Sequence, residues 1–219
     1  SRGSNLYKVG EGTLQLTGTQ ANVYRGTTRV LQGTLELGKT AGLDAVGGSV
    51  VIGDDIEASG TKTLRLLAAN QIRHLDQYDT GVLTVTVGST GVFDLNGFSD
   101  TIGNVTLTNG VTQSSVVDLG GATLTMQGST LTVNGFQGSS GVSPTSTIID
   151  GTFNIGTLES TSGIAAVIAG GSASKFFVIN DTQVGNVATD LHISANIVGA
   201  SDVSITRSGG GTLRLSGNN

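Results

Sequence analysis

The chain has 219 residues and a formal net charge of −5, and charged side chains occupy only 12% of positions, against about 25% in an average globular protein. Its 11 Lys and Arg residues are scattered, which argues against the basic face that a nucleic-acid partner needs. It has no cysteine and no run of 18 apolar residues, so we expect neither disulfides nor a membrane span.

Glycine is abundant, at 35 residues, whereas proline occurs once. This composition is typical of short strands joined by tight turns, because glycine supplies positive φ angles and β-branched residues suit a pleated surface. A chain of this length buries roughly 70% of its unfolded surface, so it needs no metal or disulfide to be stable. We expect no cofactor. We predict a single elongated all-β domain over residues 1–219.

The first predicted elements form a repeat within residues 7–39. The segment Gly12-Thr-Leu-Gln-Leu16 returns 21 residues later as Gly33-Thr-Leu-Glu-Leu37, and a third copy occupies 211–215. The two leucines of each copy lie two residues apart, so on a strand both face the same side. A strand-and-turn unit that recurs every 21 residues indicates a solenoid.

Short apolar alternations continue along the chain, and each predicts a strand with one buried face. The alternating apolar residues of these strands are Val50/Ile52, Leu64/Leu66, Leu83/Val85/Val87, Phe93/Leu95, Val105/Leu107, Val117/Leu119, Leu124/Met126, Leu131/Val133, Phe153/Ile155, Phe177/Ile179, Leu191/Ile193, Val203/Ile205 and Leu213/Leu215.

The spacing between Val117, Leu124 and Leu131 is seven residues each time, so three strands make one turn of 21. Three short strands per turn, each paired in parallel with the strand one turn away, define a parallel β-helix of roughly nine to eleven turns. A sandwich or barrel is the alternative, and Asn-Gly pairs such as 96–97 suit its hairpins. The same pairs suit solenoid corners, and the periodicity favours the β-helix.

Two stretches interrupt the alternation. Residues 67–79 have helical spacing and predict a protruding loop or a short helix, while residues 136–147, which include Pro144, predict a longer loop. The first stretch gathers titratable groups, so we list it as a possible partner contact; its candidate residues are Arg73, His74, Asp76, Tyr78 and Asp79.

The opening repeat resembles the autotransporter-associated β-strand repeat. The resemblance rests on Gly10 to Gly18, on Asn22, Tyr24 and Gly26, and on Gly33 to Gly38; residues 93–103 and 207–219 are similar to further parts of the pattern. It implies a right-handed parallel β-helix within a longer secreted or surface-displayed chain of a diderm bacterium. No barrel-forming segment is recognisable in the sequence, so this route of display is itself an inference.

Few residues in this sequence suggest catalysis or metal binding. Asp54, Asp55 and Glu57 form an acidic cluster that fits a cation site or a glycosidase pair, but a solvated turn explains it more simply. His74 near two aspartates fits a general base or a metal ligand, although surface salt bridges are the simpler interpretation. His192 alternates with Leu191 and Ile193, so we expect it to face outward.

We therefore expect a non-enzymatic extracellular structural solenoid, either a stalk or adhesin segment or a filament subunit that associates through its end turns or with neighbouring repeats. The alternative is a β-helix that binds or cleaves carbohydrate, which low aromatic content, at 4%, disfavours. A third hypothesis is a module that contacts a host surface or a glycan through residues 67–79.

Overall fold

The chain forms a stack of parallel strands. The computed structural model describes residues 3–54, 60–75, 81–135, 145–156, 173–182 and 189–219. Every regular element within these ranges is a β-strand, and the described part contains no helix. In particular, no membrane-spanning helix was found in it.

Two long sheets run the length of the molecule, and each has eight strands. Neighbouring strands in a sheet come from consecutive turns of the chain. The first sheet contains β1 (Leu6–Lys8), β3 (Thr28–Val30), β5 (Val50–Ile52), β7 (Thr84–Val87), β10 (Asn104–Thr108), β13 (Thr130–Asn134), β16 (Ala173–Ile179) and β19 (Val203–Ser208). The second contains β2 (Thr13–Gly18), β4 (Thr34–Lys39), β6 (Lys62–Leu66), β8 (Gly91–Asp94), β11 (Val116–Asp118), β14 (Ser146–Ile149), β17 (Leu191–Ile193) and β20 (Leu213–Leu215).

A third sheet of four strands covers one side of the later turns. Its strands are β9 (Asp100–Ile102), β12 (Thr123–Met126), β15 (Thr152–Asn154) and β18 (Asn196–Val198). In an earlier turn the corresponding side is irregular, with one parallel bridge between Val46 and Ile72. All strand pairs within the three sheets are parallel, and the predicted parallel β-helix with about three strands per turn is confirmed.

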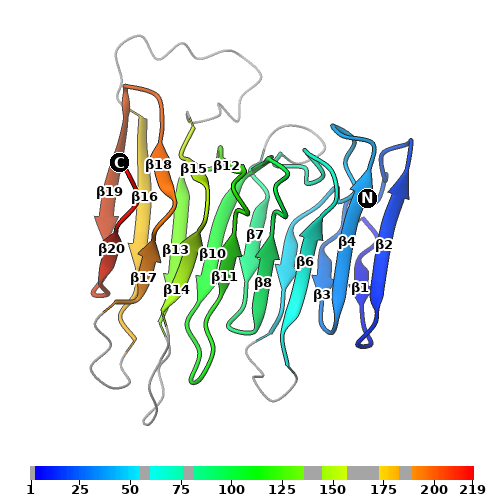
Figure 1. Cartoon of the computed structure of the whole chain (residues 1–219), viewed down its shortest axis with the longest axis horizontal. Helices are drawn as coiled ribbons and strands as arrows, with labels where there is room; N and C mark the ends of the chain where they lie inside the picture. Colours follow the sequence, from blue (N-terminus) through cyan, green and yellow to red (C-terminus); the bar gives the residue numbers. More distant parts are fainter. Residues whose placement is uncertain (1–2, 55–59, 76–80, 136–144, 157–172, 183–188) are drawn as a thin grey trace.

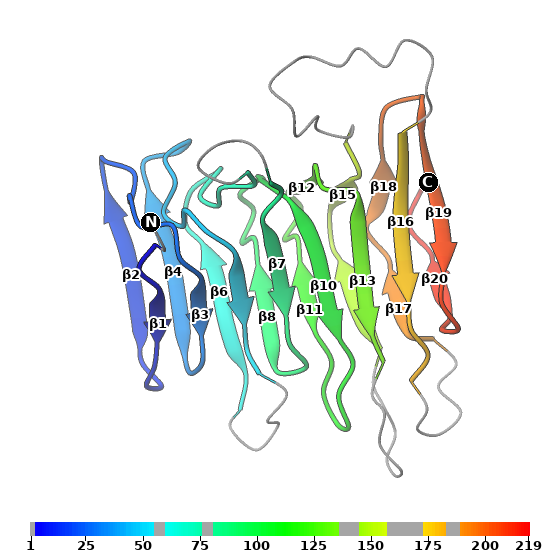
Figure 2. The same ribbon diagram turned by 180° about the vertical axis from the view of Figure 1, so that it is seen from behind.

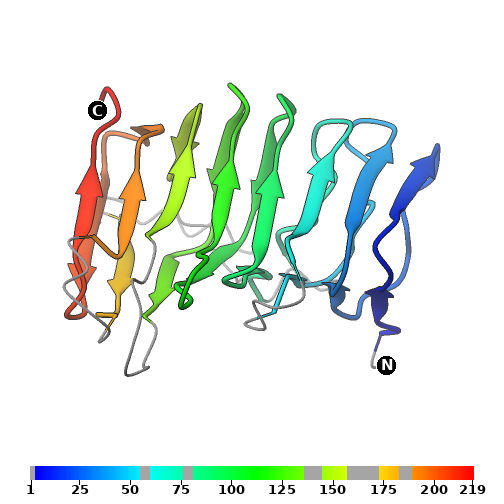
Figure 3. The same cartoon turned by 60° about the horizontal axis from the view of Figure 1, so that its bottom comes forward.

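The turns follow one another along the long axis of the molecule, from the blue N-terminal end to the red C-terminal end (Figure 1). Seen from behind, the strands of the first and second sheets alternate along this axis (Figure 2). Figure 3 shows strands of successive turns side by side in chain order. The chain is therefore a short rod with one end formed by β1 and β2 and the other by β19 and β20.

A continuous aliphatic core fills the space between the sheets. Side chains in register on the second sheet form one column, and their exposure is 1% or less; these are Leu35, Leu64, Phe93, Val117, Ile148 and Ile193. Each strand presents alternate residues to this core, as its alternating burial confirms for β4 and β6. Burying each such side chain stabilises the fold by about 1.5–3 kcal/mol.

The strand spacing near residue 120 matches the prediction. Val117, Leu124 and Leu131 lie on β11, β12 and β13, which belong to three different sheets. The predicted number of nine to eleven turns was wrong, because each of the two long sheets has eight strands in the part of the chain that the structure describes. Leu14 pairs with Leu35 after 21 residues, but Ile148 pairs with Ile193 after 45, so the number of residues per turn varies along the chain.

The corners use residues with positive φ. Asn96 and Gly97 have φ of 49° and 80°, and Asp150 has φ of 65°. Because the flanking strands pair with neighbouring turns and not with each other, Asn96-Gly97 is a solenoid corner and not a hairpin. Asn96 also donates a hydrogen bond from its side-chain amide to the carbonyl of Leu66, which ties this corner to the preceding turn.

The two predicted interruptions differ from expectation. Residues 67–75 form no helix; Ile72 is buried, with 4% exposed, and bridges to Val46, so this part belongs to the wall of the rod. Residues 76–79 lie outside the described residues.

The predicted loop over 136–147 was wrong at its end, because Ser146 and Thr147 belong to β14. Ser146 is fully buried and bonds to the Asn109 side chain, which the hydropathy pattern does not reveal.

Candidate functional site

The structure describes only part of the predicted partner contact. The Arg73 guanidinium lies 3.5 Å from the Asp44 carboxylate and donates a hydrogen bond to the carbonyl of Leu75, at 2.8 Å. The His74 carbonyl accepts a hydrogen bond from the amide of Leu83. The other three candidates, Asp76, Tyr78 and Asp79, lie outside the described residues. Arg73 therefore has a structural ion pair, and a role of this segment in binding stays a prediction.

Of the predicted acidic cluster of Asp54, Asp55 and Glu57, the structure describes only Asp54. The Asp54 carboxylate lies 3.1 Å from the ammonium of Lys62, which is fully buried, and it also lies near the hydroxyl of Thr90. Asp55 and Glu57 lie outside the described residues. Asp54 therefore neutralises a buried cation at a corner. No group of three or more acidic or histidine side chains that could hold a metal ion occurs in the described ranges.

His192 points away from the core, as predicted. Its Nε2 lies 2.7 Å from the hydroxyl of Ser216, and both side chains are on the outer surface. A serine next to a histidine resembles a nucleophile and its base, but catalysis also needs a group that orients the ring and a site for the developing oxyanion. No hydrogen bond to the other ring nitrogen is seen in the described part of the chain. The pair is therefore explained as a contact between successive turns.

Asp100 is a buried carboxylate that sequence analysis did not identify. It is 2% exposed, its Oδ2 accepts hydrogen bonds from the amides of Gln71 and Ile72, and its Oδ1 accepts one from Thr101. Burial raises the pKa of Asp100 to about 7, against the opposing effect of these three amides, and the Asp44 carboxylate adds to the increase. Asp100 therefore titrates near neutral pH while it holds two successive turns together.

Buried lysines form a second feature that sequence analysis missed. The Lys175 ammonium donates to the carbonyls of Met126, Gln127 and Gly128, at 3.0, 3.0 and 2.8 Å. Lys175 shares the inward face of β16 with Phe177, so the alternation in the sequence contained the signal. Lys8 binds carbonyls in the same way at the first corner. These ammonium groups stabilise corners and have no catalytic arrangement.

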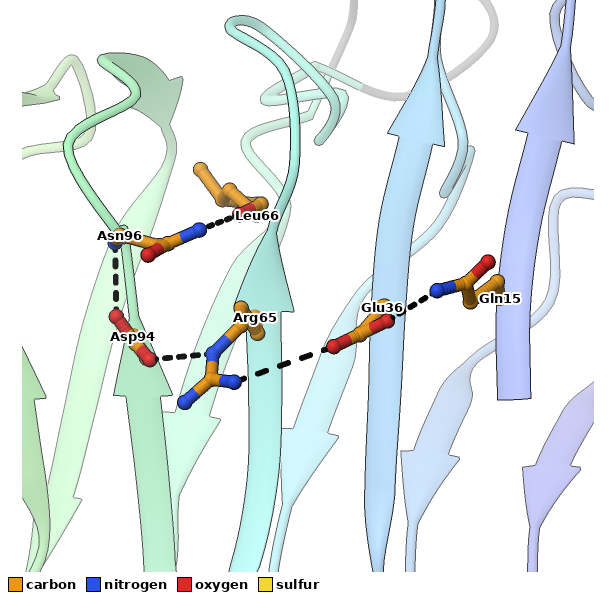
Figure 4. Close-up of polar contacts among 6 residues, drawn as sticks. All are labelled: Gln15, Glu36, Arg65, Leu66, Asp94 and Asn96. Atoms are coloured by element: carbon orange, nitrogen blue, oxygen red, sulfur yellow. Dashed lines mark hydrogen bonds and ion pairs between the residues drawn. The ribbon is translucent and has the colours of Figure 1, made fainter. Parts of the chain in front are cut away.

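A ladder of polar side chains crosses the outer face of the second sheet (Figure 4). Gln15 donates to the Glu36 carboxylate at 2.6 Å, and Arg65 lies between Glu36, at 4.0 Å, and Asp94, at 2.7 Å. Its hydrogen bond to Asp94 raises the pKa of Arg65, so the guanidinium stays charged. The ladder joins four consecutive turns and ends, at the outermost strand, on Gln15.

The outermost strands present open edges. In the second sheet β2 pairs only with β4, and β20 pairs only with β17. Leu14 on β2 is 38% exposed and Leu215 on β20 is 44% exposed, whereas their counterparts in the middle turns are buried. Each of these two strands therefore has one edge that no strand of the described residues covers.

A shallow groove of about 330 Å³ lies beside the third sheet. Its lining is Thr125, Gln127, Asn154, Gly156, Val198, Gly199 and Ala200. The Oε1 atom of Gln127 is buried and has no hydrogen-bond partner among the described residues. The groove is small, its lining is about equally polar and apolar, and none of the lining residues is charged.

Comparisons with protein-family models, with curated proteins and with solved structures find no match for this chain. The functional argument therefore rests on the rod, its continuous core and its polar ladder.

Proposed function

We propose that the chain is a non-enzymatic structural element, a stiff extracellular spacer that forms part of a stalk or adhesin on the surface of a diderm bacterium. The observation that carries the proposal is the uninterrupted core, which runs through the column from Leu35 to Ile193. In a solenoid each turn is stabilised by its neighbours, so the length of the rod is set by the number of turns. The repeat resemblance of residues 10–38 supports the location.

The experiment measures the distance between the two ends by pulsed electron spin resonance. Spin labels are attached at Thr13→Cys and Arg214→Cys, which occupy the same outward column on β2 and β20; the chain contains no other cysteine. Seven strand-to-strand steps separate these strands, so a stiff rod gives a narrow distribution centred at about 34 Å. A broad distribution would contradict a spacer role.

Glycan recognition is the second candidate, and the groove favours it. Its threonine, glutamine and asparagine side chains carry groups that can donate and accept hydrogen bonds with sugar hydroxyls. A glycan array with the wild type and Asn154→Ala tests it. Binding that is lost in the variant would support this function, and an inert wild type would exclude it.

A further inference from the structure

The outer face of the first sheet carries a regular array of short polar side chains in its middle turns. Strands β7, β10 and β13 alternate an inward aliphatic residue with an outward polar one, as their alternating burial shows. We call the outward residues the threonine face; they are Thr84 and Thr86 on β7, Asn104, Thr106 and Thr108 on β10, and Thr130, Thr132 and Asn134 on β13.

The strand register aligns these side chains into columns. Thr86 pairs with Thr106, and Thr106 pairs with Thr132, so one threonine column crosses three consecutive turns. Thr84 pairs with Asn104 in a second column, beside the first. Figure 2 shows β7, β10 and β13 side by side in this order. The threonine face is therefore a two-dimensional grid, with one axis across the turns and the other along the strands.

The dimensions of the grid follow from β-sheet geometry. Neighbouring strands lie about 4.8 Å apart, and side chains two residues apart on one strand are separated by about 6.6 Å. Threonine is branched at Cβ, so few χ1 rotamers are open to it, and the grid loses little side-chain entropy when it is covered. The continuous core beneath, which includes Val85, Val105 and Leu131, holds the three strands at these spacings.

The hydroxyls of the central column are available to solvent. Thr86, Thr106 and Thr132 are half-exposed, and among the described residues their hydroxyls make no hydrogen bond to another protein group. The Thr130 hydroxyl bonds only to its neighbour Ser129. Each free hydroxyl donates one hydrogen bond and accepts two, and each adjacent methyl group presents an apolar surface at the same spacing.

The threonine face carries no charge. In the column of Thr86, the strands of the first sheet contribute one charged residue, Arg29 on β3, and Val51 on β5 separates it from Thr86. The outer face of the second sheet differs, because the polar ladder places Glu36 and Arg65 there. By charge complementarity, a neutral surface of hydroxyls fits an uncharged partner that forms many hydrogen bonds, and it does not attract an ionic one.

A crystal of water is an uncharged partner with a matching repeat. Water oxygens on a prism plane of hexagonal ice repeat along two perpendicular axes. One repeat is slightly shorter than the strand spacing, and the other is slightly longer than the distance between alternate residues on a strand. The hydroxyls of the grid can therefore hydrogen-bond waters at positions close to those of the lattice, while the methyl groups order the waters between them.

We propose that the threonine face binds ice, with β7, β10 and β13 supplying the contact. This function goes beyond the structural role and does not depend on it. The bound protein covers part of the crystal surface, so ice grows more slowly on the covered plane and the crystal acquires facets. A dissolved sugar has no two-dimensional repeat, so the periodicity of the grid favours a crystal surface over a soluble glycan.

Ice growth measures this activity directly. Single crystals grown in a nanolitre osmometer should become faceted in the wild-type protein, and microscopy of frozen sucrose solutions should show inhibited recrystallisation. Thr106→Tyr places a large ring at the centre of the column and lifts the grid from the ice surface. We expect this variant to need an about tenfold higher concentration for the same inhibition, as for a contact weakened by about 1.4 kcal/mol.

The matched control is Thr63→Tyr, which makes the same change on the outer face of the second sheet. Thr63 is half-exposed on β6, between Thr34 and Val92 of the neighbouring turns. Tyrosine is favoured in strands, so both variants should keep wild-type circular dichroism. Thr63→Tyr should retain the full activity on ice. Thr132→Tyr, in the same column as Thr106, should lose activity as Thr106→Tyr does.

Three results would contradict ice binding by this face. The first is a wild type that leaves ice crystals round and recrystallisation unchanged. The second is an equal loss of activity in Thr106→Tyr and Thr63→Tyr. The third is binding to chitin or cellulose particles that Thr106→Tyr abolishes, without any effect of the wild type on ice, which would assign the threonine face to a crystalline polysaccharide.

Discussion

At the scale of single residues, the buried polar side chains determine how turns are joined. Asp100 receives amide hydrogen bonds from the preceding turn, and Asn109 donates to Thr182 and to the carbonyl of Asp190 while its Oδ1 accepts from Ser146. A buried polar group costs stability unless it is paired, so each such network fixes one alignment of neighbouring turns. Hydropathy patterns cannot reveal these residues, because their partners are 28 to 81 positions away.

Asp100 predicts an unusual dependence of stability on pH. Its pKa is about 7 in the folded chain and near 4 when unfolded, so folding takes up a proton between these values. The contribution of Asp100 to the free energy of unfolding is therefore most favourable below about pH 4. It falls as the pH rises to about 7 and is constant above that pH. The full change is at most about 4 kcal/mol.

Urea denaturation between pH 4.5 and 7.5 measures this effect. The free energy of unfolding should decline with pH in the wild type, and Asp100→Asn should remove the decline. Asp150→Asn is the matched control, because Asp150 is exposed and asparagine tolerates its positive φ. The assignment to Asp100 is wrong if the asparagine variant keeps the wild-type slope.

At the scale of elements, strands and corners were predictable to different degrees. Apolar alternation located β4, β6 and β13 correctly, because each has two inward aliphatic residues. Strands β9 and β18 were missed, since β9 has a single apolar residue, Ile102, and the two apolar residues of β18, Ile197 and Val198, are adjacent and do not alternate. The number of residues per turn also escaped prediction, because a solenoid accepts segments of different length between its stacked strands.

The corner between β12 and β13 depends on an element of the next turn. Lys175 reaches it from β16 and binds three carbonyls, so Lys175→Met keeps the apolar stem but leaves these acceptors without the ammonium. Unpaired buried acceptors cost about 1–3 kcal/mol. We expect Lys175→Met to lower the free energy of unfolding by about 2 kcal/mol in chemical denaturation.

The control for this change is Arg29→Met, which removes a positive charge from the outer face of β3. It should alter stability by less than about 0.5 kcal/mol. Equal stability of the two variants would mean that the Lys175 ammonium contributes nothing to the corner.

At the scale of the whole molecule, the fold followed from the sequence but the site did not. The 21-residue repeat and the seven-residue spacing from Val117 to Leu131 were sufficient to predict parallel stacking in three sheets. The candidate contact at residues 73–79 came from the density of titratable groups, and its described members, Arg73 and His74, bond within the rod.

The stacked turns share one continuous core, so we expect them to unfold as a single solenoid. Native-state hydrogen–deuterium exchange measures the free energy at which each amide opens. Backbone amides of the middle strands β6, β8, β11 and β14 should exchange slowly and with one common free energy of opening. Middle strands that exchange as separate blocks, each with its own free energy, would show that the stack is not one cooperative unit.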